Sequence, residues 1–188
     1  SSKEAAQVVN LLKKIKIKCK ILKWIGKKPK SNIQSLARFQ RYSLLLKECK
    51  KNKINNIVLG HHKDDRDENF FIRLTRGSGL KGLVSFSEKS QNFNVNFLRP
   101  LINFEKEQLI YISKKVFKGY INDPSNKDEK FKRIRIRNLI NELKKEGFDK
   151  DKLNLTLNNL KDSNEALEFY SNKNIFDNSS FNFKKNLV

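Results

Sequence analysis

Residues 56–68 read NIVLGHHKDDRDE, and this stretch decides the fold. Its first five residues, Asn56–Gly60, form a short apolar run between polar residues, as is typical of a buried parallel strand. The charged residues that follow predict a helix from about Asp65 to Thr75, which stops at Gly77. A buried strand that leads directly into a helix indicates an α/β fold.

The eight positions 61–68 hold two histidines and four acidic residues. In open parallel sheets, ligands bind just beyond the carboxyl ends of the strands. Asp65 and Glu68 are three residues apart and would share one face of the helix, where they could hold an ammonium group or Mg²⁺, or help to deprotonate an amine. The acids could instead complement the helix dipole, with His61 and His62 as local caps. The density of the cluster favours a functional site.

The chain before this stretch alternates helical and strand patterns. Apolar residues at helical spacing predict a helix over 4–16, and Ile17–Leu22 is predicted to be a short strand before a loop at 23–30. Ser31 and Gln34 form a capping-box pattern, which predicts a helix from about residue 32 to Lys51. The order of these elements predicts a parallel sheet with crossover helices.

The chain after Gly77 is predicted to form a hairpin and then helices. Val84–Phe86 and Phe93–Phe97 alternate apolar and polar residues, with 88–92 as the turn and Arg99-Pro100 as the end of the hairpin. The remaining predicted elements are a helix from a cap at Asn103 to about Phe117, a turn at Asp123–Asn126, helices at about 129–146 and 150–171, and a polar tail from Asn172.

Two pairs of arginines are candidate anion sites. Arg38 and Arg41 lie three residues apart on a predicted helix, and guanidinium groups suit phosphate because they bond two oxygens at once. Arg133 and Arg137 lie one helical turn apart and could face a substrate carboxylate or an RNA phosphate. By spacing alone, each pair is better explained as solvated surface.

Residues 73–83 form a glycine-rich basic segment. Three of the chain's seven glycines fall within six residues here, beside Arg73, Arg76 and Lys81. Glycines permit close approach of the backbone to a ligand, and the basic side chains suit phosphate. A helix end followed by a flexible loop explains the segment equally well.

Composition favours a polyanionic partner. The 188 residues include 41 basic and 20 acidic side chains, for a formal net charge of +21, and cations that neutralise phosphates release counterions. Cys19 and Cys49 form no CxxC pair, which indicates a reducing compartment, and the cytoplasm is expected. The sequence has no apolar run long enough to span a bilayer, and it has no zinc-site, Walker A or GxGxxG pattern.

Four motifs, in this order, resemble the tRNA(Ile)-lysidine synthetase family of PP-loop ATPases. They are SNIQSLARFQRY at 31–42, NIVLGHHKDDRDENFFIRLTRGSGLKGL at 56–83, FLRPL at 97–101 and DPSNKDEKFKRIRIR at 123–137. The resemblance covers roughly residues 1–145. It implies a Rossmann-like parallel sheet that is incomplete at the N-terminus and followed by a helical region. The implied division is a nucleotide-binding remainder at 1–102, a helical part of the catalytic domain at 103–147, and a helical linker or C-terminal start at 148–188.

The resemblance also implies a two-step reaction on the isoleucine tRNA with a CAU anticodon. ATP, as a substrate with Mg²⁺, adenylates carbon 2 of the wobble cytosine, and the side-chain amine of free L-lysine then displaces AMP. Arg41, Asp65 and Glu68 would be catalytic, and Asp65, Glu68 and Arg133 would bind the lysine. The implied contacts to ATP or tRNA are Arg38, Arg41, Arg76, Gly77, Ser78, Gly79 and Lys81. No protein metal site and no membrane contact are implied.

One departure from the family pattern concerns ATP. The family's SGGxDS loop does not occur in this sequence, which also has no Met and opens directly on a helical pattern. We expect the chain to be a fragment whose ATP loop lies upstream, and the 188 residues alone to bind ATP poorly and turn nothing over. The oligomeric state is left open.

Three other functions stay open at the level of sequence. Another PP-loop tRNA enzyme, such as a cytidine thiolase, is disfavoured because those enzymes generally need cysteine pairs. A metal-dependent phosphoesterase could use His61, His62, Asp64 and Asp65 as ligands. A non-catalytic basic module would bind tRNA with a steep salt dependence but without dependence on lysine.

Overall fold

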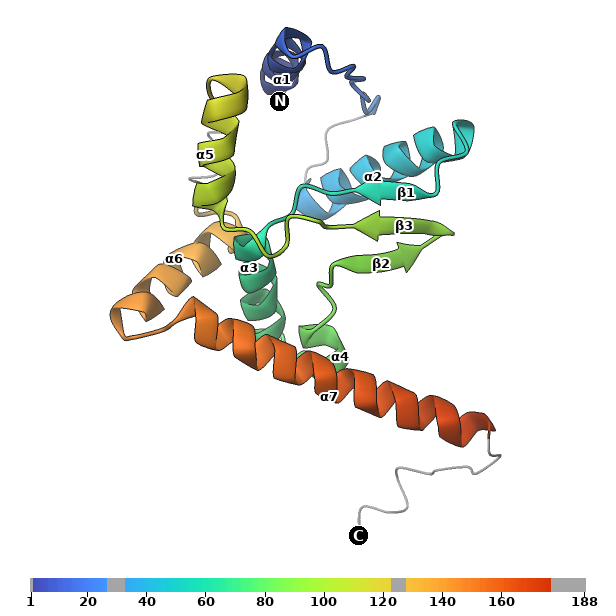
Figure 1. The fold of residues 1–188 in the computed structure, drawn as a ribbon, viewed down its shortest axis with the longest axis vertical. Helices are drawn as coiled ribbons and strands as arrows, with labels where there is room; N and C mark the ends of the chain where they lie inside the picture. The colour runs from blue at the N-terminus through green and yellow to red at the C-terminus, as the bar shows by residue number, and fades with distance from the viewer. Residues whose placement is uncertain (1, 27–32, 123–127, 177–188) are drawn as a thin grey trace. The chain divides into compact units, whose positions relative to one another are not determined.

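The computed structural model describes residues 2–26, 33–122 and 128–176. The chain divides into two compact units (Figure 1). The sheet unit comprises Ser1–Asp65 and Ser87–Asp128, and the helical unit comprises Arg66–Phe86 and Glu129–Val188. Helix α3, Lys63–Leu74, begins in the sheet unit and continues into the helical unit.

Three short strands form the sheet of the sheet unit. They are β1 (Asn56–Val58), β2 (Lys89–Asn92) and β3 (Val95–Leu98), in the order β1-β3-β2. β1 pairs with β3 in parallel, with Ile57 opposite Phe97, and β2 pairs with β3 in antiparallel fashion. The predicted α/β class is therefore confirmed, but the sheet is mixed, because the chain returns through a hairpin.

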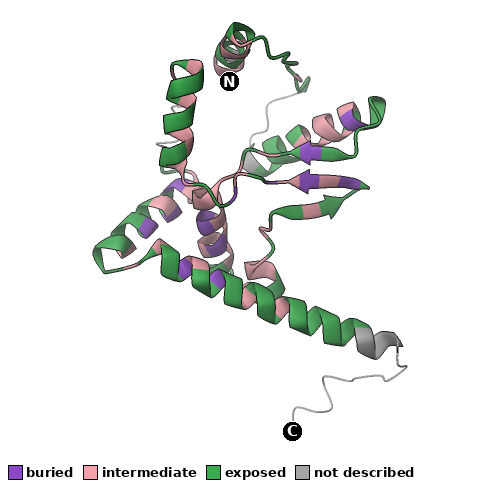
Figure 2. Cartoon of the chain, viewed as in Figure 1, coloured by how far each residue is buried: buried purple, intermediate pink, exposed green. Residues whose placement is uncertain are grey.

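Helix α2, Ile33–Lys51, covers this sheet with an apolar face. Buried Cys49, Ile57, Val95 and Phe97 form the core, and three half-buried side chains of α2 pack against it: Tyr42, Leu45 and Leu46. The rings of Tyr42 and Phe97 have centroids 5.4 Å apart. The strand residues that face this core are the purple positions of β1 and β3 in Figure 2.

Two more helices belong to the sheet unit, α1 (Ser2–Lys14) and α5 (Lys106–Phe117). The predicted cap of α5 at Asn103 is wrong, because Glu105 takes that position in a capping box with Gln108. The backbone N–H of Glu105 donates to Gln108 Oε1 at 2.9 Å. Spacing of three residues between a cap and a glutamine makes that exchange possible, and Asn103 has no such partner in its helix.

The helical unit contains the rest of α3 together with α4 (Leu80–Leu83), α6 (Lys132–Lys145) and α7 (Lys150–Phe176). Phe70 of α3 and Leu153 and Leu157 of α7 are buried together, with Leu83 and Leu160 packed against them. Phe71 meets Phe148 edge to face, at 5.7 Å between centroids. The first turns of α7 therefore anchor α3 and α4, while its residues 165–172 are exposed (Figure 2).

Two predictions about strands are wrong in part. Ile17–Leu22 was predicted to be a strand, but it has no regular secondary structure and pairs with none of the strands in the described part of the chain. A strand exists only through hydrogen bonds to a neighbour, and a sequence pattern cannot supply the neighbour. Strand β1 is parallel as predicted, but only Ile57 of Asn56–Val58 is buried.

The predicted hairpin exists in a different register. Lys89–Asn92, expected within the turn, is strand β2, and Val84–Phe86 is not a strand. The turn consists of Phe93 and Asn94, whose φ angles of 50° and 59° are both positive. Such two-residue turns match the twist of paired strands, so the turn geometry set the register. Arg99-Pro100 follows the end of β3, as predicted.

The predicted helices are confirmed in type over all six segments, and α7 runs five residues beyond its expected end at 171. The Ser31 cap, the turn at Asp123–Asn126 and the tail beyond Phe176 lie outside the described residues. Within the described residues, no helix combines the length and apolar character that crossing a membrane requires.

Candidate functional site

The junction of β1 and α3 lies at the carboxyl edge of the sheet. The backbone N–H of Leu59 donates to Leu98 O at 2.8 Å, which extends the pairing of β1 and β3 by one residue. Gly60 and the two histidines then lead into α3, and the N–H of Lys63 donates to Phe104 O at 2.9 Å. The acid-rich stretch therefore begins where the carboxyl ends of two parallel strands meet, which is the edge that binds ligands in open sheets.

Asp65 is tied back to the start of its own helix. Its Oδ2 accepts a hydrogen bond from the backbone N–H of His62 at 3.1 Å and lies 3.5 Å from His62 Nε2. Both side chains are mostly buried, at 17% and 18% exposure. A carboxylate at this third helical position that bonds the N–H of the capping residue is half of a capping box. The structure therefore gives Asp65 a definite orientation and a role in helix initiation.

Among the residues that the structure describes, Glu68 is one of the two large side chains that are fully buried, at 1% exposure. Its Oε1 accepts hydrogen bonds from Arg137 Nε at 2.8 Å and from Arg137 Nη2 at 2.6 Å. Both residues belong to the helical unit, where Arg137 reaches Glu68 from α6. A charge-assisted pair with two N–H donors on one oxygen fixes the carboxylate, and burial strengthens the electrostatic term.

The neighbouring acids and histidines are arranged differently. Asp67 is as buried as Glu68, and its Oδ1 lies 3.5 Å from Arg66 Nη2. His61 and Asp64 are half-buried. Within the described part of the chain, no three His, Cys, Asp or Glu side chains gather closely enough to hold a metal ion. The ligand set suggested for a phosphoesterase, His61, His62, Asp64 and Asp65, is thus not assembled there.

Arg38 and Arg41 lie on the exposed side of α2 in the sheet unit. The Arg38 guanidinium carbon lies 5.0 Å from the centre of the Tyr42 ring, and Arg38 Nη2 donates to Tyr42 Oη at 3.4 Å. Arg41 lines a cavity between α2 and the segment after α1. The two arginines therefore have different surroundings, although they are three residues apart.

The glycine-rich segment lies between α3 and α7 of the helical unit. Gly77 has a φ of +68°, a left-handed conformation that a side chain disfavours, so it ends α3 as the sequence predicted. An added Cβ on Gly82 would lie 2.9 Å from Ser78 Cβ, so this turn is tightly closed. Lys81 Nζ pairs with Glu168 Oε1 of α7 at 3.1 Å. Arg76, Gly77 and Gly79 are exposed and Ser78 is half-buried.

Two arginines of α6 bear on the acid-rich stretch. Arg133, which the resemblance associates with the lysine site, is half-buried, and Arg137, one helical turn later, bonds Glu68. From the sequence, Arg137 was considered with Arg133, because of their spacing, as a partner for a substrate carboxylate or an RNA phosphate, and its pairing with Glu68 was not predicted. The only signal in the sequence was that spacing, because the pairing with Glu68 joins residues 69 positions apart.

The predicted site residues are distributed over both units. Arg38, Arg41 and Asp65 belong to the sheet unit, whereas Glu68, the glycine-rich segment and Arg133 belong to the helical unit. Two groups are assembled within single units: His62 with Asp65, and Glu68 with Arg137. In chemical terms, the first group can hold a cation or accept a proton, and the second presents a fixed negative charge.

Comparison with known proteins agrees with these features. Residues 1–143 match the model of the PP-loop domain. A tRNA(Ile)-lysidine synthase of Wolbachia pipientis wMel is 37% identical over 172 residues, which cover 91% of this chain and 40% of that protein. Two further tRNA(Ile)-lysidine synthases show the same partial coverage. The protein of Orientia tsutsugamushi (strain Boryong) is 43% identical, and the match covers 74% of this chain and 32% of that protein. The protein of Bradyrhizobium diazoefficiens is 33% identical, and the match covers 89% of this chain and 46% of that protein.

The chain thus spans less than half the length of these relatives. The match to the family model covers most of the chain, including both strands of the parallel pair and the acid-rich start of α3. The described fold has the parallel strand pair and covering helix that a Rossmann-like domain requires. On these grounds, the chain belongs to the PP-loop domain family.

Proposed function

We propose that the chain is part of a tRNA(Ile)-lysidine synthetase, an ATP-dependent ligase that attaches lysine to a cytosine of tRNA. The proposal covers the substrates as well: ATP, free L-lysine and the isoleucine tRNA with a CAU anticodon. It is supported by the family, by the curated relatives and by one observation in the structure. That observation is the buried carboxylate of Glu68, which two N–H groups of Arg137 hold at 2.6 and 2.8 Å.

The buried pair matters because it argues against a simple surface explanation of the acid-rich stretch. Surface acids that only complement a helix dipole stay in water, where they lose no hydration. Glu68 is 1% exposed and Asp67 is 1% exposed, and burial of carboxylates is costly unless they are paired. Buried and paired carboxylates are frequent at functional sites, which favours a chemical role for Glu68.

In the first step, the O2 atom of the wobble cytosine attacks the α-phosphorus of ATP, and pyrophosphate leaves. Arg41 is proposed to stabilise the phosphates, since a guanidinium can bond two oxygens of a phosphate at once. Mg²⁺ would accompany the triphosphate and neutralise part of its charge. Mg²⁺ at such sites usually binds phosphates, water and one or two carboxylates.

In the second step, the ε-amine of lysine attacks carbon 2 of the activated base. The new C–N bond forms as the C–O bond breaks, and AMP leaves with the oxygen. The amine must lose a proton to act as a nucleophile. Asp65, Glu68 and Arg133 are proposed to bind the lysine, with the carboxylates orienting its amine and an arginine facing its carboxylate.

The remaining proposals concern the tRNA and the chain as a whole. Arg38 and the segment from Arg76 to Lys81 would contact ATP or tRNA phosphates, consistent with the net charge of +21. We also propose a cytoplasmic location without membrane contact. We retain the division into a nucleotide-binding part at 1–102, a helical catalytic part at 103–147 and a helical extension at 148–188.

The direct test is lysine incorporation. The intact protein that contains this chain is incubated with ATP, radiolabelled lysine and a CAU-anticodon tRNA transcript, and labelled tRNA, AMP and pyrophosphate are measured. Asp65→Asn and Glu68→Gln are expected to lower lysine incorporation at least a hundredfold. Glu142→Gln is the matched control, because Glu142 is an exposed acid of the helical unit that pairs with Lys145. Undiminished incorporation in both site variants would refute the proposal.

A further inference from the structure

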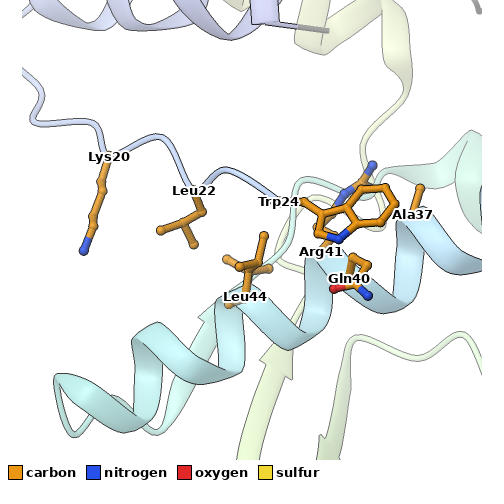
Figure 3. A pocket seen from close by; sticks show the side chains of 8 residues that line it. Lys20, Leu22, Trp24, Ala37, Gln40, Arg41 and Leu44 are labelled. Carbon is orange, nitrogen blue, oxygen red and sulfur yellow. The ribbon is translucent and has the colours of Figure 1, made fainter. Parts of the chain in front are cut away.

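A cavity of about 380 Å³ lies in the sheet unit, and its lining includes none of the acid-rich residues 61–68 (Figure 3). One wall is the segment after α1, with Lys20, Leu22 and Trp24, and the other wall is α2, with Gln40, Arg41 and Leu44. Its volume falls within the range of about 300–1,000 Å³ that is usual for small-molecule sites. Trp24, Lys20 and Gln40 have no part in the ligation steps proposed above.

The lining combines three kinds of chemistry. Leucine side chains supply an apolar surface, the indole of Trp24 supplies a flat aromatic one, and Gln40 supplies an amide donor and acceptor. Figure 3 shows the indole of Trp24, Gln40 and Arg41 at one end of the cavity and Lys20 at the other. A flat ring flanked by a hydrogen-bonding amide and a cation is the surface that a nucleotide base with its phosphate requires.

The two cations of the cavity differ in their partners. Lys20 Nζ is paired with Glu48, and this hydrogen bond lowers the pKa of the Glu48 carboxyl. Among the described residues, no ion pair or hydrogen bond engages the guanidinium of Arg41. The charge that is open to an anionic ligand therefore lies at the same end as Trp24.

The orientation of the indole depends on Gly26. A Cβ on Gly26 would lie 2.8 Å from Trp24 Nε1, which is closer than real contacts allow, and 3.2 Å from Cε2, which is tight. The ring therefore rests on the glycine backbone, while 40% of the Trp24 surface stays exposed. A large aromatic ring with that much exposure beside a cavity is suited to stack against a ligand.

We propose that this cavity binds a nucleotide, whose base stacks on Trp24 and whose phosphate bonds Arg41, with Gln40 at the edge of the base. The inference deepens the proposed function, which needs a nucleotide either as free ATP or as part of tRNA. Both sources share the chemistry of a base joined to a phosphate, and the experiment distinguishes them. Trp24 and Arg41 then act together on one ligand from two segments that are distant in the chain.

The chain has one tryptophan, so its fluorescence reports directly on this cavity. AMP and CMP are expected to quench the emission of Trp24, whereas ribose 5-phosphate, which has no base, leaves it unchanged. Gly26→Ala is expected to change the emission of the unliganded protein and to weaken AMP binding, because the added methyl group displaces the indole. Quenching by ribose 5-phosphate equal to that by AMP would overturn the stacking role.

Affinities measured by equilibrium dialysis with ATP and by filter binding with a tRNA transcript identify the source. Stacking of one base is worth roughly five- to 150-fold in affinity, so Trp24→Leu should weaken one of the two ligands by about tenfold. Trp24→Phe should recover most of that loss. Phe39→Leu is the matched control, since Phe39 is a 65% exposed ring on α2 that does not line the cavity. If Trp24→Leu weakens neither ligand more than Phe39→Leu does, the proposal falls.

Arg41 is tested by a comparison of ligands. Arg41→Gln is expected to weaken AMP about tenfold and to leave adenosine binding unchanged, whereas a merely structural role would weaken both equally. Failure here is distinguishable from failure of the proposed function. If the protein ligates lysine and Trp24→Leu binds ATP and tRNA normally, only the nucleotide site at the cavity is refuted. If the cavity binds nucleotide but the protein does not ligate lysine, only the proposed ligase activity is refuted.

Discussion

Each of the two units is stabilised internally by a different kind of interaction. The helical unit depends on a few deeply buried side chains, namely the Glu68–Arg137 pair and the cluster of Phe70, Leu153 and Leu157. The sheet unit has a small apolar core and three strands of three or four residues, two of which are joined by a two-residue turn. Loss of a charged partner is therefore expected to cost most in the helical unit, whereas the turn of the sheet unit is a place where a substitution can stabilise.

The largest effect is expected for Arg137→Met. This change leaves the Glu68 carboxylate buried without the two N–H donors that now hold its Oε1. Removal of one partner of a buried ion pair costs about 3–5 kcal/mol, because the remaining buried charge has lost its hydration and two hydrogen-bond donors. Urea unfolding measured by circular dichroism gives the change in the free energy of unfolding.

Two further variants sharpen this result. Glu68→Gln combined with Arg137→Met should recover a large part of the loss, since no unpaired charge remains. Glu142→Gln, which removes an exposed acid of α6 that pairs with Lys145, should change stability by less than about 0.5 kcal/mol. Equal losses in Arg137→Met and Glu142→Gln would mean that burial does not distinguish the two pairs.

An intermediate effect is expected for Asp65→Ala, at the end of the sheet unit. The substitution removes the bond from the His62 N–H to Asp65 Oδ2 at 3.1 Å. Loss of a side chain that caps a helix costs about 1 kcal/mol, and this site lies between the buried and exposed cases at 17% exposure. Asp65→Asn keeps an oxygen acceptor and should restore most of that stability without restoring activity. A loss as large as that of Arg137→Met would contradict the proposed difference between the units.

A stabilising change is expected in the hairpin turn of the sheet unit. Phe93 has a φ of 50° and is 76% exposed, so it occupies a left-handed position without compensating burial. Phe93→Asn places a residue there that tolerates positive φ and should stabilise by about 0.5–1 kcal/mol. The same change at Phe104, which is 44% exposed outside the turn, is the control. No gain at Phe93 would show that turn geometry does not limit this unit.

This turn also shows where prediction from sequence failed. The sequence places Phe at a position that glycine or asparagine usually occupies, so the local signal for the turn was weak and the strands were predicted in the wrong register. Strand β1 and helix α3 were predictable, because an apolar run and an acidic helix start are local signals. Ile17–Leu22 looked like a strand for the same local reason, but pairing is not local.

The candidate site also contains residues that could be identified from the sequence and residues that could not. Asp65 and Glu68 could be identified from their density and spacing, and the contact from His62 to Asp65 joins residues three apart. Arg137 could not be assigned from sequence, because its contact with Glu68 joins two helices. The cavity at Trp24 was also missed, since its two walls lie on either side of residues 27–32 and a lone tryptophan carries no spacing pattern.

The smallest effect is expected for the exposed pair between Lys81 and Glu168 of the helical unit, whose side chains are 84% and 50% exposed. The hydrogen bond from Lys81 is the main cause that holds the pKa of Glu168 below its ordinary value of 4.5. A carboxyl with a lowered pKa in the folded state stabilises the fold above its unfolded-state pKa, and this contribution disappears as the pH falls through the folded-state value. Glu168→Gln should therefore differ slightly from the parent in unfolding free energy at pH 7, and the two should converge below pH 4.5. High salt should remove the same difference at pH 7, because exposed charges are screened. A difference that persisted in acid or in salt would place Glu168 with the buried Glu68 pair, and the contrast between exposed and buried charges in this unit would fail.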